Sequence, residues 1–191
     1  MTIYFLRHEE RPMEDSTFLT ELTKNGKDRA ASSLKEALIK LNINTVYCSP
    51  FIRCLQTINP FIKESGLKVN IENCIQEVFW DPKFQDKPNA KLSDEQKQQY
   101  NVSNKYTALL SSNTLSYPES ETSVRLRVNK FSQYLKNKYS DSCTNILICS
   151  HMSPVNFLIN EFSEDLDRGL MEQYDMGKIS HVEGNNILFI N

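Results

Sequence analysis

The chain has 191 residues, of which 39% are hydrophobic and 24% are charged, and its formal net charge is −2. This composition is typical of a globular protein, and the length predicts a single domain over residues 1–191. A charge so close to zero excludes a broad basic surface, so we expect neither nucleic acid nor a membrane as a partner. No apolar run approaches the ~20 residues that a membrane-spanning helix needs.

The N-terminus and the cysteines both favour a location inside the cell. Arg7 interrupts the first apolar stretch, so the chain lacks the pattern of a secretory signal. The five cysteines are odd in number and form no C-x-x-C pair, which is typical of reduced thiols. We therefore expect a cytoplasmic protein in which Cys48, Cys74 and Cys149 are small core residues.

Short apolar runs alternate with helical patterns in the first half of the chain, which predicts an α/β fold. The expected strands are residues 3–6, 45–48 and 68–71, and the expected helices are residues 23–41 and 49–65. In the second helix, Ser49 is predicted to be the N-cap and Pro50 the first helical residue. Gly66 provides the stop signal.

Residues 79–118 are polar and irregular, with scattered aromatic side chains. This pattern predicts an excursion beside the sheet, either a lid or substrate wall or else a decorated surface loop. A short helix is expected from Ser93 towards Tyr100. Four side chains are candidates for the mouth of a pocket: Phe79, Trp80, Lys83 and Phe84.

The last third of the chain continues the alternation. Val124, Val128, Phe131 and Leu135 mark one face of a helix, and residues 145–149 form a strongly apolar strand. Further helices are expected from Ser153–Pro154 onward and over residues 163–174, followed by a hairpin of residues 179–182 and 187–190. The whole pattern predicts a three-layer sandwich, with a mostly parallel central sheet flanked by helices and a C-terminal antiparallel hairpin at its edge.

Two of the three histidines directly follow predicted strands. His8 follows residues 3–6 and Arg7, and His151 follows residues 145–149. In an open parallel sheet, ligands bind beyond the carboxyl ends of the strands, so both imidazoles are expected in one crevice. Arg53 is predicted in the first turn of a helix, where backbone N–H groups also favour anions. The third histidine, His181, lies in a predicted terminal strand and is expected to be structural or exposed.

An arginine beside a histidine suits attack on phosphate. The planar guanidinium of Arg7 offers donors that match phosphate oxygens. Its charge also disfavours the imidazolium form of His8, which keeps the ring neutral and nucleophilic. Taken alone, this pair is equally consistent with a histidine that caps a strand, but Arg53 and His151 favour the anion site.

Four segments occur in an order that resembles the histidine phosphatase superfamily, the phosphoglycerate mutase-like proteins. They are Phe5-Leu6-Arg7-His8, the run Ser49-Pro50-Phe51-Ile52-Arg53-Cys54-Leu55-Gln56-Thr57, Pro118-Glu119-Ser120 with Arg127, and Ile148-Cys149-Ser150-His151. No single segment is decisive, whereas four in this order are specific.

The resemblance implies a metal-independent phosphomonoester hydrolase with no cofactor. His8 would be the nucleophile that takes up the phosphoryl group, and Glu77 would protonate the leaving oxygen. His151 would belong to the catalytic group as well. The phosphate oxygens would be bound by Arg7, Arg11, Arg53 and His151. The substrate would be a small-molecule or peptide phosphomonoester, and aromatic residues at the pocket mouth would suit a ring-bearing or peptide group.

Two departures from the family pattern leave alternatives open. Glu9 and Met152 follow the two histidines, where the family usually has glycine. A carboxylate beside the phosphate site could repel a dianion, so one alternative is a phospho-ligand-binding module with weakened or lost catalysis. A second alternative is a mutase that acts on a phosphorylated sugar acid. The residues after Glu77 lack the basic side chains that such a substrate needs, which favours a phosphatase.

Other hydrolase classes fail on spacing. Cys48 and Arg53 form C-x4-R, whereas cysteine phosphatases use C-x5-R, and the chain has no G-x-S-x-G elbow or P-loop. The sequence carries no signal for the oligomeric state.

Overall fold

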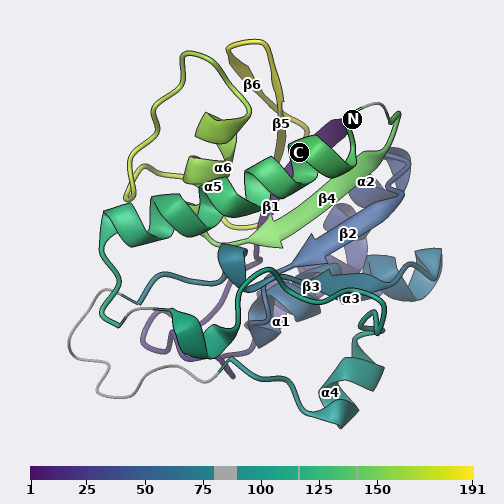
Figure 1. Ribbon diagram of the computed structural model, residues 1–191. Helices are drawn as coiled ribbons and strands as arrows, with labels where there is room; N and C mark the ends of the chain where they lie inside the picture. Colours follow the sequence, from purple (N-terminus) through teal and green to yellow (C-terminus); the bar gives the residue numbers. More distant parts are fainter. Residues whose placement is uncertain (80–89, 116, 141) are drawn as a thin grey trace.

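A six-stranded sheet forms the centre of the protein (Figure 1). The computed structural model describes residues 1–79, 90–115, 117–140 and 142–191. The strand order is β3-β2-β4-β1-β5-β6. The strands are β1 Thr2–Arg7, β2 Thr45–Cys48, β3 Val69–Ile71, β4 Asn145–Ser150, β5 Ile179–Glu183 and β6 Asn186–Phe189. The first four are parallel, and β5 and β6 are antiparallel at one edge, as the sequence predicts.

Helices cover both faces of the sheet (Figure 1). The helices are α1 Lys24–Arg29, a π-helical turn Ala30–Leu34, α2 Lys35–Lys40, α3 Ile52–Ser65, α4 Asp94–Gln99, α5 Glu121–Lys138 and α6 Met152–Glu161, with 3-10 turns at Asn73–Ile75 and Ser112–Thr114. Helices α1 to α3 cover one face, and α5 and α6 cover the other. The three-layer sandwich expected from the sequence is therefore confirmed. None of the helices in the described ranges has the length and apolarity to cross a bilayer.

The alternation of side chains along β1 divides the core into two parts. Ile3 and Phe5 pack with the apolar faces of α5 and α6, whereas Leu6 packs with α2 and α3. Successive side chains of a strand point to opposite faces, so one strand supplies both cores. Phe5 and Leu6 are fully buried, and burial of each such side chain stabilises the fold by roughly 1.5–3 kcal/mol.

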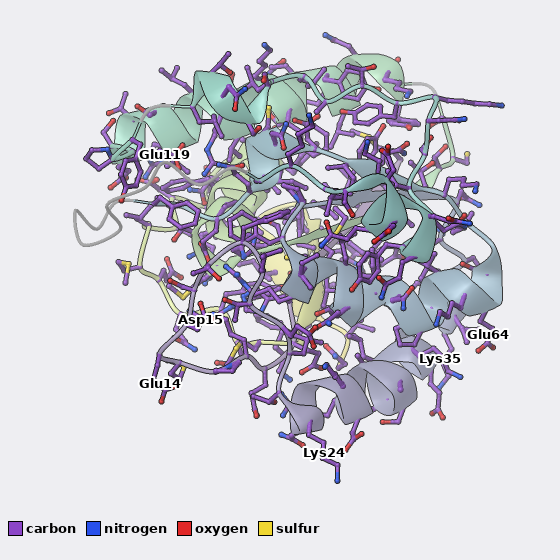
Figure 2. The ribbon with its side chains drawn as sticks, turned by 90° about the horizontal axis from the view of Figure 1, so that it is seen from below. Glu14, Asp15, Lys24, Lys35, Glu64 and Glu119 are labelled. Carbon is purple, nitrogen blue, oxygen red and sulfur yellow. The ribbon has the colours of Figure 1, made fainter. Side chains whose placement is uncertain are left out.

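The helix at residues 24–40 begins where its sequence predicts. The hydroxyl of Thr23 accepts a hydrogen bond from the backbone N–H of Gly26, which caps α1. An ion pair of 3.0 Å between Lys35 and Glu64 joins α2 to α3, and both side chains are labelled side by side in Figure 2. Gly66 ends α3 in the left-handed conformation at φ 71°, which confirms it as the stop signal.

Helix α3 begins two residues later than expected. Its N-cap is Phe51, which has no side-chain cap, and its first residue is Ile52. The prediction of Ser49 as N-cap and Pro50 as first helical residue is therefore wrong. The hydroxyl of Ser49 instead lies 2.8 Å from Nε2 of His151. A side chain that could have capped the helix is used to hold an imidazole.

Residues 163–174 do not form a helix, contrary to the expectation. Turns follow α6, and two asparagines of that helix hold the loop in place. Asn156 donates to the carbonyls of Gly169 and Glu172, and Asn160 donates to the carbonyl of Arg168. These side-chain bonds satisfy the loop carbonyls, so the loop needs no helical hydrogen bonds of its own.

The described part of segment 79–118 packs along the β3 edge of the sheet. The short helix is confirmed as α4, which Ser93 and Gln96 begin with a capping box. Val102 forms a bridge to Val69 of β3. Trp80, Lys83 and Phe84, the predicted residues of the pocket mouth, lie outside the described residues. Phe79 is buried and stacks on Phe51 at 5.6 Å between ring centroids.

Candidate active site

His8 and His151 meet at the carboxyl ends of β1 and β4. These strands are parallel neighbours, with Arg7 opposite Ser150, so the residues that follow them lie together. The backbone N–H of His8 donates to the carbonyl of Ser150 at 3.0 Å. The two ring centroids are 5.2 Å apart, and both side chains are buried. Strands that are far apart along the chain thus bring the two imidazoles together at one edge of the sheet.

The hydrogen bonding of His8 fixes its tautomer. Nδ1 lies 2.7 Å from the backbone oxygen of Glu9. A carbonyl can only accept, so Nδ1 carries the proton and Nε2 presents a free lone pair. Burial lowers the pKa of His8 well below its usual value, and the positive charge of Arg53 lowers it further. The ring is therefore neutral at physiological pH and has one nucleophilic nitrogen.

Arg53 and Glu77 form an ion pair beside the two histidines. Nη2 of Arg53 lies 3.1 Å from Oε2 of Glu77, and its other terminal nitrogen donates to the carbonyl of Thr17 at 2.9 Å. The guanidinium is fully buried and lies over the ring of Phe51 at 4.6 Å. Burial alone would raise the pKa of Glu77, but the charges of His151 and Arg53 outweigh it and hold the pKa well below its usual value. Glu77 is therefore a carboxylate when the pocket is empty.

His151 lies between Glu77 and the base of α3. Its Nδ1 is 3.2 Å from Oε2 of Glu77, and its Nε2 is 2.8 Å from Oγ of Ser49 and 3.5 Å from Sγ of Cys54. Burial alone would lower the pKa of His151, but the Cys54 sulfur and the Glu77 carboxylate outweigh it and raise the pKa. The pKa values of the two histidines are thus shifted in opposite directions, so His8 stays neutral and His151 is favoured as a cation.

Arg7 and Arg11 complete a ring of positive charge. Arg7 donates to the carbonyl of Tyr174 at 2.5 Å, and Arg11 donates to backbone carbonyls of its own loop. The Nε atoms of both arginines are buried without a hydrogen-bond partner. Burial lowers the pKa of each, and each feels the charges of Glu77 and Arg53. Three guanidinium groups thus interact electrostatically with one carboxylate, and this excess of positive charge suits a dianion.

The loop that carries Arg11 also carries two acidic residues. Glu14 and Asp15 are exposed, and Figure 2 labels them together at one side of the molecule. The carbonyl of Asp15 accepts from Arg11 at 2.9 Å, and its carboxylate accepts from the backbone of Thr17. Since Thr17 also binds Arg53, this loop connects two of the three arginines.

Glu9 does not face the phosphate pocket. Its carboxylate is buried and binds Arg29 of α1 through two guanidinium nitrogens, at 2.9 and 2.8 Å. Among the described residues, only Asn42 and Asn101 combine a side chain with a positive φ, so position 9 needs no glycine conformation. The space for the carboxylate exists because Gly177 has no side chain. The departure from glycine at position 9 is therefore compensated by Arg29 and Gly177.

Met152, the second departure, is the first residue of α6. Its side chain is half-buried and packs on the core beneath α5 and α6. Its backbone is helical, so this position needs no glycine either.

Several polar residues that the sequence reasoning left without a role hold the site residues in place. Arg127 pairs with Glu119 at 2.8 and 3.0 Å, and it donates to the carbonyls of Cys74 and Glu77. Thr57 accepts from the backbone N–H of Glu9 at 2.9 Å. All three side chains belong to the four ordered segments of the sequence, and that order was the signal that could have identified them.

Sequence comparison identifies the family. The model of the histidine phosphatase superfamily (branch 1) matches residues 3–186. The chain belongs to the histidine phosphatase superfamily. No curated protein sequence matches this superfamily member.

Solved structures of phosphatases share the fold of this histidine phosphatase superfamily member. An ecdysone phosphate phosphatase from Bombix mori, in complex with tungstate, is 15% identical with a TM-score of 0.70, covering 100% of this chain and 92% of its own. The alpha-ribazole phosphatase from Shigella flexneri is 20% identical with a TM-score of 0.70, covering 100% and 96%. The protein histidine phosphatase SixA, also with tungstate, is 18% identical with a TM-score of 0.57, covering 99% and 94%.

Proposed function

We propose that the protein is a phosphomonoester hydrolase that works through a phosphohistidine on His8 without a metal ion. One observation carries this proposal: a buried, neutral imidazole presents its free Nε2 to a pocket that contains an excess of guanidinium charge. Phosphoryl transfer needs an aligned nucleophile and neutralised oxygens more than it needs other covalent chemistry. Family membership supports the same reading.

In the first step, Arg7, Arg11, Arg53 and His151 bind the phosphate oxygens. Nε2 of His8 attacks phosphorus in line, the N–P bond forms, and the bond from phosphorus to the ester oxygen breaks. The hydrogen bond from Nδ1 to the Glu9 carbonyl then stabilises the positive ring of the phosphohistidine. In the second step, water attacks phosphorus, inorganic phosphate leaves, and His8 regains its lone pair.

Glu77 supplies the proton that an alkoxide leaving group needs. In the empty pocket its pKa is depressed because His151 and Arg53 stabilise the carboxylate. A bound phosphate dianion takes over both of these partners and adds negative charge, so the pKa of Glu77 rises when substrate binds. The carboxylate then takes up a proton from solvent and donates it to the leaving oxygen. The carboxylate that results accepts a proton from the attacking water, and this proton returns to solvent when phosphate leaves.

The substrate class proposed is a small-molecule or peptide phosphomonoester. The similar structures are phosphatases whose names refer to ecdysone phosphate, alpha-ribazole and protein histidine. The pairing of Glu9 with Arg29 supports turnover over the alternative of a phospho-ligand-binding module, since it keeps the carboxylate away from the phosphate. We also infer that residues 1–191 act as one domain, because β1 pairs with β4 and β5 from the end of the chain.

The test compares His8→Ala with His181→Ala, which changes the histidine outside the pocket. A panel of phosphomonoesters should be hydrolysed by the wild type and by His181→Ala in the presence of chelator, and His8→Ala should be inactive. Rapid quenching with a 32P-labelled substrate should trap label on the wild type and on His181→Ala, but not on His8→Ala. Substantial turnover by His8→Ala would refute the mechanism, and binding of phosphomonoesters without labelling or turnover would establish the binding module instead.

A further inference from the structure

His8, Glu77 and His151 form a cluster of potential metal-ligand atoms. One ligand atom from each of these side chains lies within 4.8 Å of the others. Nδ1 of His151 is buried without a well-formed hydrogen bond and faces Oε2 of Glu77 at 3.2 Å. Donors about 2.0–2.1 Å from a tetrahedral zinc ion are about 3.3 Å apart, so this pair already has the spacing of two zinc ligands.

The nitrogen of each imidazole that points away from the cluster is already bonded. Nδ1 of His8 donates to the Glu9 carbonyl at 2.7 Å, and Nε2 of His151 lies 2.8 Å from the hydroxyl of Ser49. Histidines that bind metal ions almost always have such a partner on the second nitrogen, because it fixes the ring and the tautomer. Here both partners are in place before any ligand arrives. Nδ1 of His151, which lies 3.2 Å from Oε2 of Glu77, gives up its proton to solvent when it binds the metal.

We propose that the empty pocket is a binding site for a divalent cation of the zinc class, held by His8, Glu77 and His151. Two imidazoles and one carboxylate are a ligand set that zinc accepts, with the remaining position open to water. The cation would take the lone pair of Nε2 of His8, so metal and phosphoryl group would compete for the same atom. Inhibition by the cation rests on the proposed function, whereas binding of the cation does not.

The positive charge of Arg53 weakens the binding of a cation at this site, which gives a second prediction. Its guanidinium lies 3.1 Å from the same oxygen of Glu77 and carries a permanent positive charge. Arg7 and Arg11 add charge of the same sign nearby. Loss of the charge at position 53 should therefore strengthen zinc binding and weaken binding of inorganic phosphate, two effects of opposite sign.

The experiment measures Zn²⁺ binding by the full chain in competition with a chromophoric chelator, without any substrate. His8→Ala and His151→Ala should each raise the Kd for Zn²⁺ by at least the roughly 10–100-fold that supporting residues alone are worth. The matched controls are His181→Ala, whose imidazole lies 3.4 Å from Glu183, and Cys143→Ser, whose thiol is exposed. Both controls should bind Zn²⁺ as the wild type does.

Two outcomes would overturn the proposal: no stoichiometric binding by the wild type, or binding that His8→Ala and His151→Ala leave unchanged. Folding of each variant is checked by circular dichroism, and Arg53→Gln provides an independent measurement through its opposite effects on Zn²⁺ and phosphate. If Arg53→Gln changed the Kd values for Zn²⁺ and for phosphate in the same direction, that result would also count against the site. A separate assay with a phosphomonoester should give competitive inhibition by Zn²⁺ that chelator reverses; if no substrate is turned over, the binding data still decide the metal site.

Discussion

Gly177 and the carboxylate of Glu9 occupy one small space, so a single methyl group at position 177 should disturb the site. Gly177 has a positive φ of 75°, and a Cβ built there would lie 2.3 Å from Oε1 of Glu9. The Glu9 side chain would have to move, and its bonds to Arg29 would break. The N–H of Gly177 also donates to the carbonyls of Arg7 and His8, both at 3.1 Å, so the change reaches the proposed nucleophile.

The expected cost of Gly177→Ala has two parts. The left-handed backbone costs about 1–2 kcal/mol for a residue with a Cβ. Loss of hydrogen bonds to a charged group costs about 1.5–3 kcal/mol, and the lower end applies because the Arg29 side chain is 42% exposed. The sum is about 2–4 kcal/mol. In a Glu9→Gly background the second part vanishes, so the coupling between the two positions should be about 1–2 kcal/mol.

Urea denaturation of the wild type, Glu9→Gly, Gly177→Ala and the double variant gives this coupling as a double-mutant cycle. The kcat/KM of Gly177→Ala for a phosphomonoester should fall and should recover in part in the double variant. An equal loss of unfolding free energy from Gly177→Ala in both backgrounds would refute the steric argument.

Three further predictions concern residues of the pocket. Glu77→Gln should reduce the rate of hydrolysis of alkyl phosphates by roughly 10²–10⁴-fold. It should reduce the rate for an aryl phosphate with a good leaving group far less, and equal losses of rate for both substrates would exclude Glu77 as a general acid. Arg127→Met leaves the Glu119 carboxylate buried and unpaired, so the free energy of unfolding should fall by about 3–5 kcal/mol; adding Glu119→Leu should restore stability but not turnover, since Glu77 loses its support. Because the pKa of His8 is lowered well below its usual value of about 6.5, its imidazole stays unprotonated as the pH falls through 6.5. The kcat/KM, corrected for substrate ionisation, should therefore show no acidic limb near 6.5, and a limb at that pH would contradict the assigned state of the nucleophile.

The strands of the fold could be predicted because their apolar patterns are local. Each of the expected strands appears within one or two residues, and Gly66 and Ser93 mark helix ends by their own conformational preferences. The errors come from long-range competition. Ser49 is a good helix cap, but its hydroxyl is hydrogen-bonded to His151, which lies 102 residues further along the chain. Residues 163–174 have a helical pattern, but the asparagines of α6 bind their carbonyls first.

The candidate site was predictable as a set of residues but not as a set of ionisation states. The order of the sequence segments brings His8, Arg53 and His151 together, and the sheet topology explains why. The carboxylate state of Glu77 depends on its ion pairs with Arg53 and His151, which no local pattern encodes. In the same way, the sequence alone suggests that the Glu9 carboxylate repels phosphate. The structure shows that this carboxylate is instead paired with Arg29.

The central position of β1 has a consequence for how the protein folds during synthesis. Residues Thr2–Arg7 leave the ribosome well before both neighbours of this strand, because β4 and β5 lie beyond residue 144. Until those residues emerge, β1 has two unpaired edges, and pairings of such long sequence separation are slow to form. A nascent chain that stops before Asn145 therefore exposes an apolar strand that other chains can pair with. Chaperone binding to stalled chains of increasing length should persist until β4 is free and decline once β5 follows.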